Sequence, residues 1–423
     1  MFKTPLITTI ALATAALTHA GHAQAADLTI SCGAVGAELT LCQEGVSAWE
    51  EKTGHRVDVV STPNSSTERL SLYQQILSAN SSDIDIMQID VVWPGLLANH
   101  LLDLHEVLGS DAAEGHFEAI VTNNTIDERL VAMPWFTDAG VLYYRADLLE
   151  KHGFEVPETW VELTETARHI KAAERDAGND RMHGFVFQGR AYEGLTVNAL
   201  EWVASHGGGS LVESDGEISI NNPLAAEALE LAASWVGDIA PSGVLNYTEE
   251  EARGVFQGGN AVFMRNWPYA WALAQSDDSD VRGKVGVTQL PHGDQGHSAG
   301  GLGGWNLAVS RYSDNPELAA ELVAFLTGHD EQKRRAIEAS YNPTLDALYQ
   351  DNEVLDAVPF FGELYDTVVN AVARPSAPTG DAYGRVSNAF FSATHDVLSG
   401  DKDGATAVAD LERELSRIKR RNW

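Results

Sequence analysis

The sequence predicts an α/β protein built from more than one folding unit. Short apolar runs with strand character lie at 28–31, 57–60 and 84–89, and stretches with apolar residues at helical spacing lie between them at 39–51 and 65–77. This alternation predicts a parallel sheet with helices on both faces. The chain has 423 residues, which is more than one simple core organises, so two domains or lobes are expected.

Later segments carry the same signals. Strands are predicted at 141–144, 184–187, 285–290 and 306–310. Helices are predicted at 160–174, from Pro223 onward, and at 316–326, where Asn315 and Pro316 form the cap. The C-terminal segment is expected to be largely helical, with an interruption at 373–378. Asp90 stands at the carboxyl end of the strand at 84–89. Ligands of such sheets bind outside that edge, so Asp90 is placed for a ligand contact.

The charge balance excludes several kinds of partner. The chain carries 28 Lys and Arg against 61 Asp and Glu, which gives a net charge of -33. Nucleic acid is excluded because its phosphates need basic side chains, and anionic membrane surfaces are disfavoured for the same reason. The acidic residues are scattered along the chain, which is typical of a solvated surface.

The N-terminus has the pattern of a secretory signal peptide over residues 1–25. Lys3 provides the positive start, a short apolar run covers 6–17, and Ala23-Gln24-Ala25 is a small-residue cleavage site. The apolar run is too short to span a membrane as a helix. We therefore expect cleavage after Ala25 and a soluble mature protein that is exported to the periplasm.

The two cysteines, Cys32 and Cys42, are predicted to form a disulfide. An even pair in an exported chain favours this pairing, which would stabilise the fold by roughly 2–3 kcal/mol. Two free, buried thiols are the alternative. The spacing of the pair excludes a redox C-x-x-C motif or a metal site.

The segment from Arg265 to Trp271 concentrates three aromatic rings around Pro268. Proline is tolerated in the first turn of a helix but not in its interior. The rings are therefore expected at a loop-to-helix junction, where two of them face a cleft. Flat aromatic faces pack against the C–H side of a sugar ring. Core packing of all three rings is the alternative.

Motifs for cofactor or metal chemistry are missing from the sequence. The glycines at 300–304 do not match a phosphate loop, and neither H-E-x-x-H nor G-x-S-x-G occurs. The segment 401–404 resembles a calcium loop only incompletely. Carboxylates do lie beside aromatic residues, with Asp90 near Trp93 and Asp138 near Trp135. Since carboxylates accept strong hydrogen bonds from hydroxyls, these pairs indicate polyol binding, with no cofactor and no metal.

Several segments together resemble the extracellular solute-binding proteins of ABC sugar transporters, and most closely the trehalose/maltose (α-glucoside) branch. The matching segments are spread over the mature chain in family order, at 87–93, 133–145, 192–195, 256–271 and 302–310. The resemblance implies the periplasmic-binding-protein fold, with two doubly wound α/β lobes joined by a hinge of two or three crossing segments. Lobe 1 would comprise 26–134 and about 286–335, and lobe 2 about 135–285 and 336–423.

The same resemblance implies a set of ligand-binding residues. Asp90 and Asp138 would accept hydrogen bonds from sugar hydroxyls, Arg374 would donate one, and Gly304 would offer a backbone contact. Stacking on sugar rings would come from Trp267, Tyr269 and Trp305. Glu38 and Arg69 also match family positions, whereas Phe136 replaces a tyrosine that the family can carry there. Other roles for these residues are helix capping for the two aspartates, core packing for Trp305, a surface ion pair for Arg374, and simple exposure for Glu193.

The expected function is capture of an α-linked disaccharide, such as trehalose, maltose, sucrose or a related α-glucoside, and its delivery to an ABC transporter permease. The protein is expected to be a monomer and not an enzyme. The rival function is a secreted glycoside hydrolase with Asp90 and Asp138 as acid and base. Such an enzyme needs its two carboxyls at a defined separation, which the sequence alone does not show. Binding of a non-sugar osmolyte is a third hypothesis.

Overall fold

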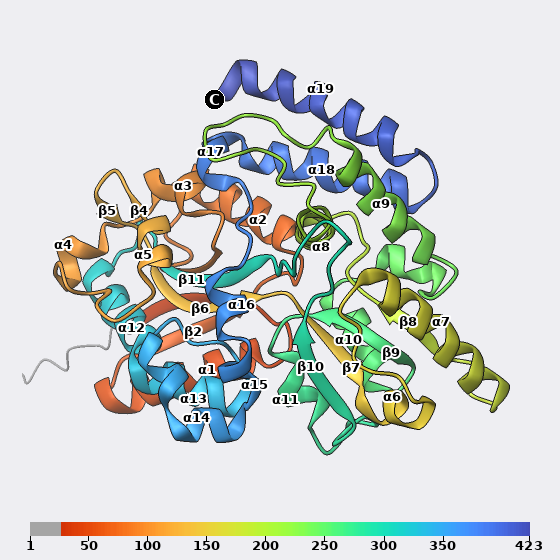
Figure 1. Ribbon diagram of the computed structural model, residues 1–423. Helices are drawn as coiled ribbons and strands as arrows, with labels where there is room; N and C mark the ends of the chain where they lie inside the picture. Colours follow the sequence, from red (N-terminus) through yellow and green to blue (C-terminus); the bar gives the residue numbers. More distant parts are fainter. Residues whose placement is uncertain (1–26) are drawn as a thin grey trace, which may run out of the picture.

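Two β-sheets organise the protein, each in its own α/β lobe (Figure 1). The computed structural model describes residues 27–423. The expected signal peptide, 1–25, and the cleavage site after Ala25 lie outside the described residues. Within 27–423 no helix is both long enough and apolar enough to cross a membrane.

The first sheet contains the three strands that the alternating pattern predicts. Its order is β2 (Arg56–Ser61), β1 (Asp27–Cys32), β3 (Ile86–Asp90), β11 (Leu302–Val309) and β6 (Met133–Ala139). The strand β1 pairs in parallel with both β2 and β3, as predicted. The other two pairs, β3 with β11 and β11 with β6, are antiparallel, because β11 re-enters this sheet from the second lobe.

Helices cover both faces of this sheet (Figure 1). On one face, α1 (Glu38–Thr53) and α12 (Pro316–Thr327) share an apolar core with Ile86 of β3. On the other face, Tyr73 and Leu77 of α2 (Ser66–Ser78) pack with Met87 and Ile89. All five residues of β3 are buried, and because successive strand residues point to opposite faces, its apolar side chains serve both cores.

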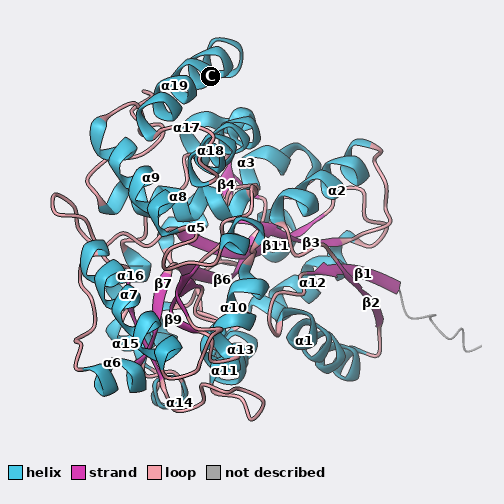
Figure 2. Ribbon diagram, turned by 90° about the vertical axis from the view of Figure 1, so that its right-hand side faces the viewer, coloured by secondary structure: helices cyan, strands magenta, loops and turns pink. Residues whose placement is uncertain are grey.

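The second sheet has the order β10 (Val285–Gln289), β7 (Val141–Arg145), β9 (Ala261–Asn266) and β8 (His183–Val186). One face carries α7 (Trp160–Asp176), α8 (Glu193–Ser205), α9 (Pro223–Trp235), α18 (Tyr383–Leu398) and α19 (Gly404–Asn422). Figure 2 shows α18 and α19 stacked over α8 and α9. The opposite face packs against α10 (Glu249–Gln257) and α11 (Ala270–Ala274). Since all six residues of β9 are buried, it lacks the alternation that would mark it as a strand in the sequence.

Shorter elements complete the two lobes. They are α3 (Pro94–Leu97), α4 (Leu104–Leu108), α5 (Glu118–Asn123), β4 (Thr125–Ile126), β5 (Arg129–Leu130), α6 (Ala146–His152), α13 (His329–Ala339), α14 (Asn352–Ala357), α15 (Phe360–Glu363), α16 (Tyr365–Val369) and α17 (Ser376–Thr379). Four short 3-10 turns, η1 (Ala98–His100), η2 (Ser242–Asn246), η3 (Asp346–Gln350) and η4 (Gly380–Ala382), link them.

Local signals explain where several helices begin. The Ser65 hydroxyl accepts a hydrogen bond from the Glu68 N–H at the start of α2. Thr159 and Glu162 form a capping box at the start of α7. The predicted cap at Asn315 is wrong in one respect. The side chain of Asn315 makes no capping bond within the described chain, and α12 starts with Pro316 at its first position.

Three segments connect the two sheets and lie side by side. The first is Gly140 between β6 and β7, the second runs from β10 to β11 through Gly301, and the third contains Val372. The Gly140 N–H donates to the Gly301 carbonyl at 3.2 Å, and the Leu302 N–H donates to the Val372 carbonyl at 2.8 Å. The expected lobe limits, 26–134 with about 286–335 and about 135–285 with 336–423, stay a proposal.

The disulfide between Cys32 and Cys42 is present. It joins the end of β1 to the first half of α1, and both cysteines are fully buried. The bond therefore ties the helix to the sheet directly beside Glu38, the first residue of α1.

Candidate ligand-binding site

A cavity lies between the two lobes, at the edge of the first sheet where β3 ends. Side chains from both lobes and from the connecting segments line it. The lining includes all the sequence-predicted ligand residues except Arg69, namely Glu38, Asp90, Asp138, Trp267, Tyr269, Gly304, Trp305 and Arg374. Asp90 lines this cavity from the carboxyl end of β3.

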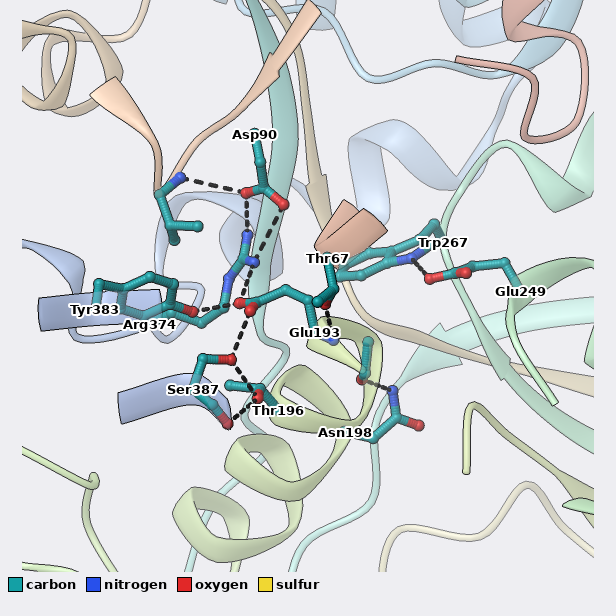
Figure 3. Close-up of polar contacts among 12 residues, drawn as sticks. Thr67, Asp90, Glu193, Thr196, Asn198, Glu249, Trp267, Arg374, Tyr383 and Ser387 are labelled. Atoms are coloured by element: carbon teal, nitrogen blue, oxygen red, sulfur yellow. Dashed lines mark hydrogen bonds and ion pairs between the residues drawn. The ribbon is translucent and has the colours of Figure 1, made fainter. Parts of the chain in front are cut away.

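Arg374 joins the two lobes at one end of the cavity. Its Nη2 lies 2.6 Å from Oδ1 of Asp90, and its Nη1 lies 2.8 Å from Oε1 of Glu193 at the start of α8 (Figure 3). The side chain of Arg374 is only 3% exposed, so the alternative of a surface ion pair is wrong. Burial opposes the charged form, but Asp90 and Glu193 together hold the pKa of Arg374 well above its usual range.

Glu193 is buried, which contradicts the alternative that it is simply exposed. Its carboxylate accepts hydrogen bonds from Ser387 Oγ at 2.5 Å and from the Tyr383 hydroxyl, both on α18 (Figure 3). Its backbone N–H donates to Oγ1 of Thr67 in the first lobe at 3.1 Å. Glu193 therefore holds Arg374 on one side and meets the first lobe on the other.

Asp90 also shapes its own turn, because its Oδ1 accepts from the Val92 N–H at 3.2 Å ahead of α3. This contact closes a turn and does not cap the helix, because the N-cap residue of α3 is Trp93 and no side chain in the described chain caps it. A carboxylate has about four acceptor positions, and Val92 and Arg374 together take three of them. One position on Oδ2 stays open for a ligand hydroxyl.

Asp138 and Glu38 are buried carboxylates with oxygen atoms that lack partners. Asp138 Oδ1 and Glu38 Oε2 make no hydrogen bond to any part of the chain that the structure describes. Burial raises the pKa of Asp138 well above its ordinary value, and the nearby charge of Glu38 raises it further. Burial also raises the pKa of Glu38. Unpaired buried acceptors are costly, so both oxygens are suited to accept hydrogen bonds from a bound ligand.

Two tryptophans face the cavity, each with a guanidinium on one face. Arg265 lies 3.9 Å from the ring centroid of Trp267, and Arg69 lies 4.2 Å from that of Trp305. Both indoles are only partly buried and line the cavity, so each has a face available to a ligand. Arg69 thus lies behind Trp305, and its Nε and Nη2 donate to the Pro63 carbonyl.

The aromatic segment divides as its proline suggested. Pro268 precedes α11, and Trp267 and Tyr269 line the cavity. Trp271 instead packs against Phe360, with ring centroids 5.5 Å apart. Of the three rings, therefore, two line the cavity and the half-buried third packs against Phe360 instead.

The glycines at 303 and 304 allow the strand β11 to approach the cavity closely. Gly304 has a φ of +114°, and a Cβ there would lie 2.5 Å from the carbonyl oxygen of Phe136. A Cβ at Gly303 would lie 2.8 Å from the Trp267 ring. Both positions accept only glycine without a shift of their neighbours.

The comparisons with known proteins agree on one family. The family model of bacterial extracellular solute-binding proteins matches residues 37–333. The chain belongs to this family. This solute-binding protein is 52% identical, over 411 residues, to a probable ABC transporter-binding protein of Deinococcus radiodurans, and the match covers 97% of this chain and 98% of that one.

Solved structures show the same fold. The maltose-bound MalE3 protein of T. maritima is 39% identical to this solute-binding protein, with a TM-score of 0.88 over 93% of this chain and 99% of that one. A ribitol complex of a solute-binding protein from Agrobacterium radiobacter has a TM-score of 0.82 at 21% identity, over 93% and 98% of the two chains. The expected periplasmic-binding-protein fold is therefore confirmed.

Some residues of the cavity were missed in the sequence. Besides Glu193, these polar and aromatic lining residues are Asn64, Ser66, Tyr192, Glu249 and Tyr341. Tyr192 lies next to Glu193, in a segment that the family resemblance did match. Glu249 belongs to the acidic first turn of α10, which has the appearance of an ordinary helix start. Tyr341 follows α13 and carries no local signal of its position.

The cavity has no constellation for a metal. Over residues 27–423, no group of three or more His, Cys, Asp or Glu is arranged to hold an ion. Glu249 accepts a hydrogen bond from the Tyr192 hydroxyl at 2.7 Å. It also accepts one from Nε1 of Trp267 at 3.4 Å (Figure 3). Its carboxylate thus fixes side chains of the cavity wall.

Proposed function

We propose that this solute-binding protein captures an α-linked disaccharide outside the cytoplasm and delivers it to the permease of an ABC transporter. Trehalose, maltose, sucrose and related α-glucosides are the candidate ligands. The observation that carries the proposal is the combination of two half-buried indoles with the partnerless carboxylate oxygens of Glu38 and Asp138. Apolar ring faces and hydroxyls are the two surfaces of a sugar. The maltose-bound MalE3 protein, 39% identical, supports the choice of an α-glucoside.

Each residue has a distinct proposed role. Trp267, Trp305 and Tyr269 stack on the sugar rings, while Asp138, Glu38 and the open position of Asp90 accept hydrogen bonds from hydroxyls. Arg374 donates through its Nε, which has no hydrogen-bond partner in the described part of the chain. Arg69 keeps the Trp305 ring in place from behind the cavity wall.

The proposed mechanism is binding without chemistry. Most acceptor positions of Asp90 are taken by Arg374 and the Val92 N–H, whereas a glycoside hydrolase needs both of its carboxyls free to act on the scissile bond. The family of the chain is one of solute-binding proteins, which supports the same conclusion.

A sugar panel tests the ligand class directly. Trehalose, maltose or sucrose at saturation is expected to raise the melting temperature, since a ligand that binds only the folded protein stabilises it by about 2.7 kcal/mol at a concentration of 100 Kd. Laminaribiose, mannitol and glycine betaine serve as controls for β-linkage, open-chain polyols and osmolytes. A shift with glycine betaine alone would contradict the proposal, and release of glucose from the bound disaccharide would favour the hydrolase.

Closure of the two lobes around the sugar is the second expectation. The lobes touch directly through the Arg190–Glu68 ion pair at 2.8 Å, through Glu193 and Thr67, and through Arg374. Contacts that exist only in the closed arrangement favour it when a ligand fills the cavity. We expect small-angle scattering to show a smaller radius of gyration with saturating sugar than without it. An unchanged radius would indicate a rigid pocket instead.

A further inference from the structure

A buried ion pair lies directly beneath the stacking ring of Trp267. Arg265, near the end of β9, donates from Nε to Oε2 of Glu201 at 2.8 Å and from Nη2 to Oε1 at 2.5 Å. Glu201 comes from α8, and the two side chains are 1% and 0% exposed. Nη1 of Arg265 donates to Oε1 of Gln188 at 3.1 Å. The guanidinium is therefore fixed in position by a bidentate pair and a third bond.

The Arg265–Glu201 ion pair contacts the Trp267 ring through its guanidinium. The guanidinium of Arg265 is 3.9 Å from the ring centroid, a distance typical of a strong cation–π contact. Glu249 lies 3.4 Å from the indole Nε1, and Gly303 leaves room for the outer edge of the ring. One face and one edge of the indole are thus held by protein, while the ring still lines the cavity.

The same pair is attached to the segments that connect the lobes. Oε1 of Glu201 accepts a hydrogen bond from the Gly301 N–H at 3.0 Å. A Cβ at Gly140 would lie only 1.9 Å from Oε1 of Glu201 and 2.5 Å from Nη2 of Arg265. Two of the three connecting segments therefore pack against the ion pair, and through it against the stacking ring.

We propose that Arg265 and Glu201 are positioning residues. They hold the Trp267 ring in a fixed position relative to the connecting segments, so that the free face of the ring points to the sugar. This inference rests on the proposed sugar-binding function. A buried ion pair adds little stability over apolar residues of similar volume, so stability alone does not account for it. Lysine cannot replace Arg265, because an ammonium lacks the planar fork that binds Glu201 while it stacks on the ring.

A double-mutant cycle separates positioning from general structural support. Arg265→Lys is expected to weaken disaccharide binding about tenfold, as measured by calorimetry. In a Trp267→Ala background the same substitution is expected to change the affinity less than about twofold, because the ring on which Arg265 acts is gone. An equal loss in both backgrounds would overturn the proposal. Arg145→Lys is the matched control, since Arg145 is a buried, ion-paired arginine of the same sheet, and it should leave the affinity unchanged.

A ligand-free measurement keeps this inference apart from the proposed function. The near-ultraviolet circular dichroism spectrum of Trp267→Ala is subtracted from that of the wild type, and the difference is the signal of the fixed Trp267 ring. The corresponding difference in the Arg265→Lys background is expected to be clearly smaller, and an undiminished signal would overturn the proposal even if no sugar binds. If Arg265→Lys does not fold, the paired substitution Arg265→Met/Glu201→Met removes both charges together and provides the same comparison.

Discussion

Asp138→Ala is expected to weaken disaccharide binding about tenfold or more, because a buried sugar hydroxyl left without its charged acceptor costs about 1–3 kcal/mol. Asp138 Oδ1 has no partner within residues 27–423, so the ligand would be its first one. Calorimetric titration measures the loss. Asp58→Ala, at an exposed position of the strand β2, is the control and should bind as wild type.

Asp138→Asn distinguishes a ligand contact from a structural role. Burial, and then the charge of Glu38, raise the pKa of Asp138 in the folded protein. The folded protein therefore binds this proton more readily than the unfolded chain, and the stability contributed by the group is present at low pH and lost as the pH rises through the raised pKa. Without ligand, Asp138→Asn should melt at a higher temperature than wild type at pH 8, with a difference that shrinks toward pH 4.

The same substitution should reduce sugar affinity and remove part of its pH dependence. Hydroxyl donors favour the charged carboxylate, so wild-type affinity is expected to fall as the pH is lowered through the raised pKa of Asp138. A variant that is both more stable and weaker in binding would show a site that retains a costly charge for its ligand. Wild-type affinity in both Asp138 variants would remove this carboxylate from the site.

Trp267→Ala is expected to weaken binding to a similar extent, about tenfold or more, through the loss of an indole face and the apolar area that it covers. Because Arg265 keeps its bidentate pair with Glu201, the fold should survive, as far-ultraviolet circular dichroism would show. Trp267→Phe retains an aromatic face and should lie between wild type and the alanine variant.

Trp271→Phe is the matched control for Trp267. It alters a tryptophan of the same segment that packs against Phe360 and not against the cavity. Its sugar affinity should equal that of wild type. If Trp267→Ala also bound like wild type, the stacking role would be wrong and the ring would serve only to cover Arg265.

Local patterns determined much of the architecture. Short apolar runs separated by stretches of helical spacing placed β1, β2 and β3 and the helices between them, because these patterns depend on residues that are close in the chain. Pro268 located the junction before α11, since its ring is incompatible with a helix interior. The family resemblance then selected residues that the structure brings together in one cavity, with Arg69 behind its wall.

The tertiary structure alone decided which charges meet. Asp90 and Arg374 are separated by 284 positions in the chain, and Arg265 and Glu201 by 64. No local sequence pattern therefore predicts either pair. The same holds for Tyr341 in the cavity wall and for the burial of Glu193. Strand ends and helix starts follow from the residues nearby, whereas the partner of a buried charge depends on how the lobes and their connecting segments pack, because only that packing removes the charge from water.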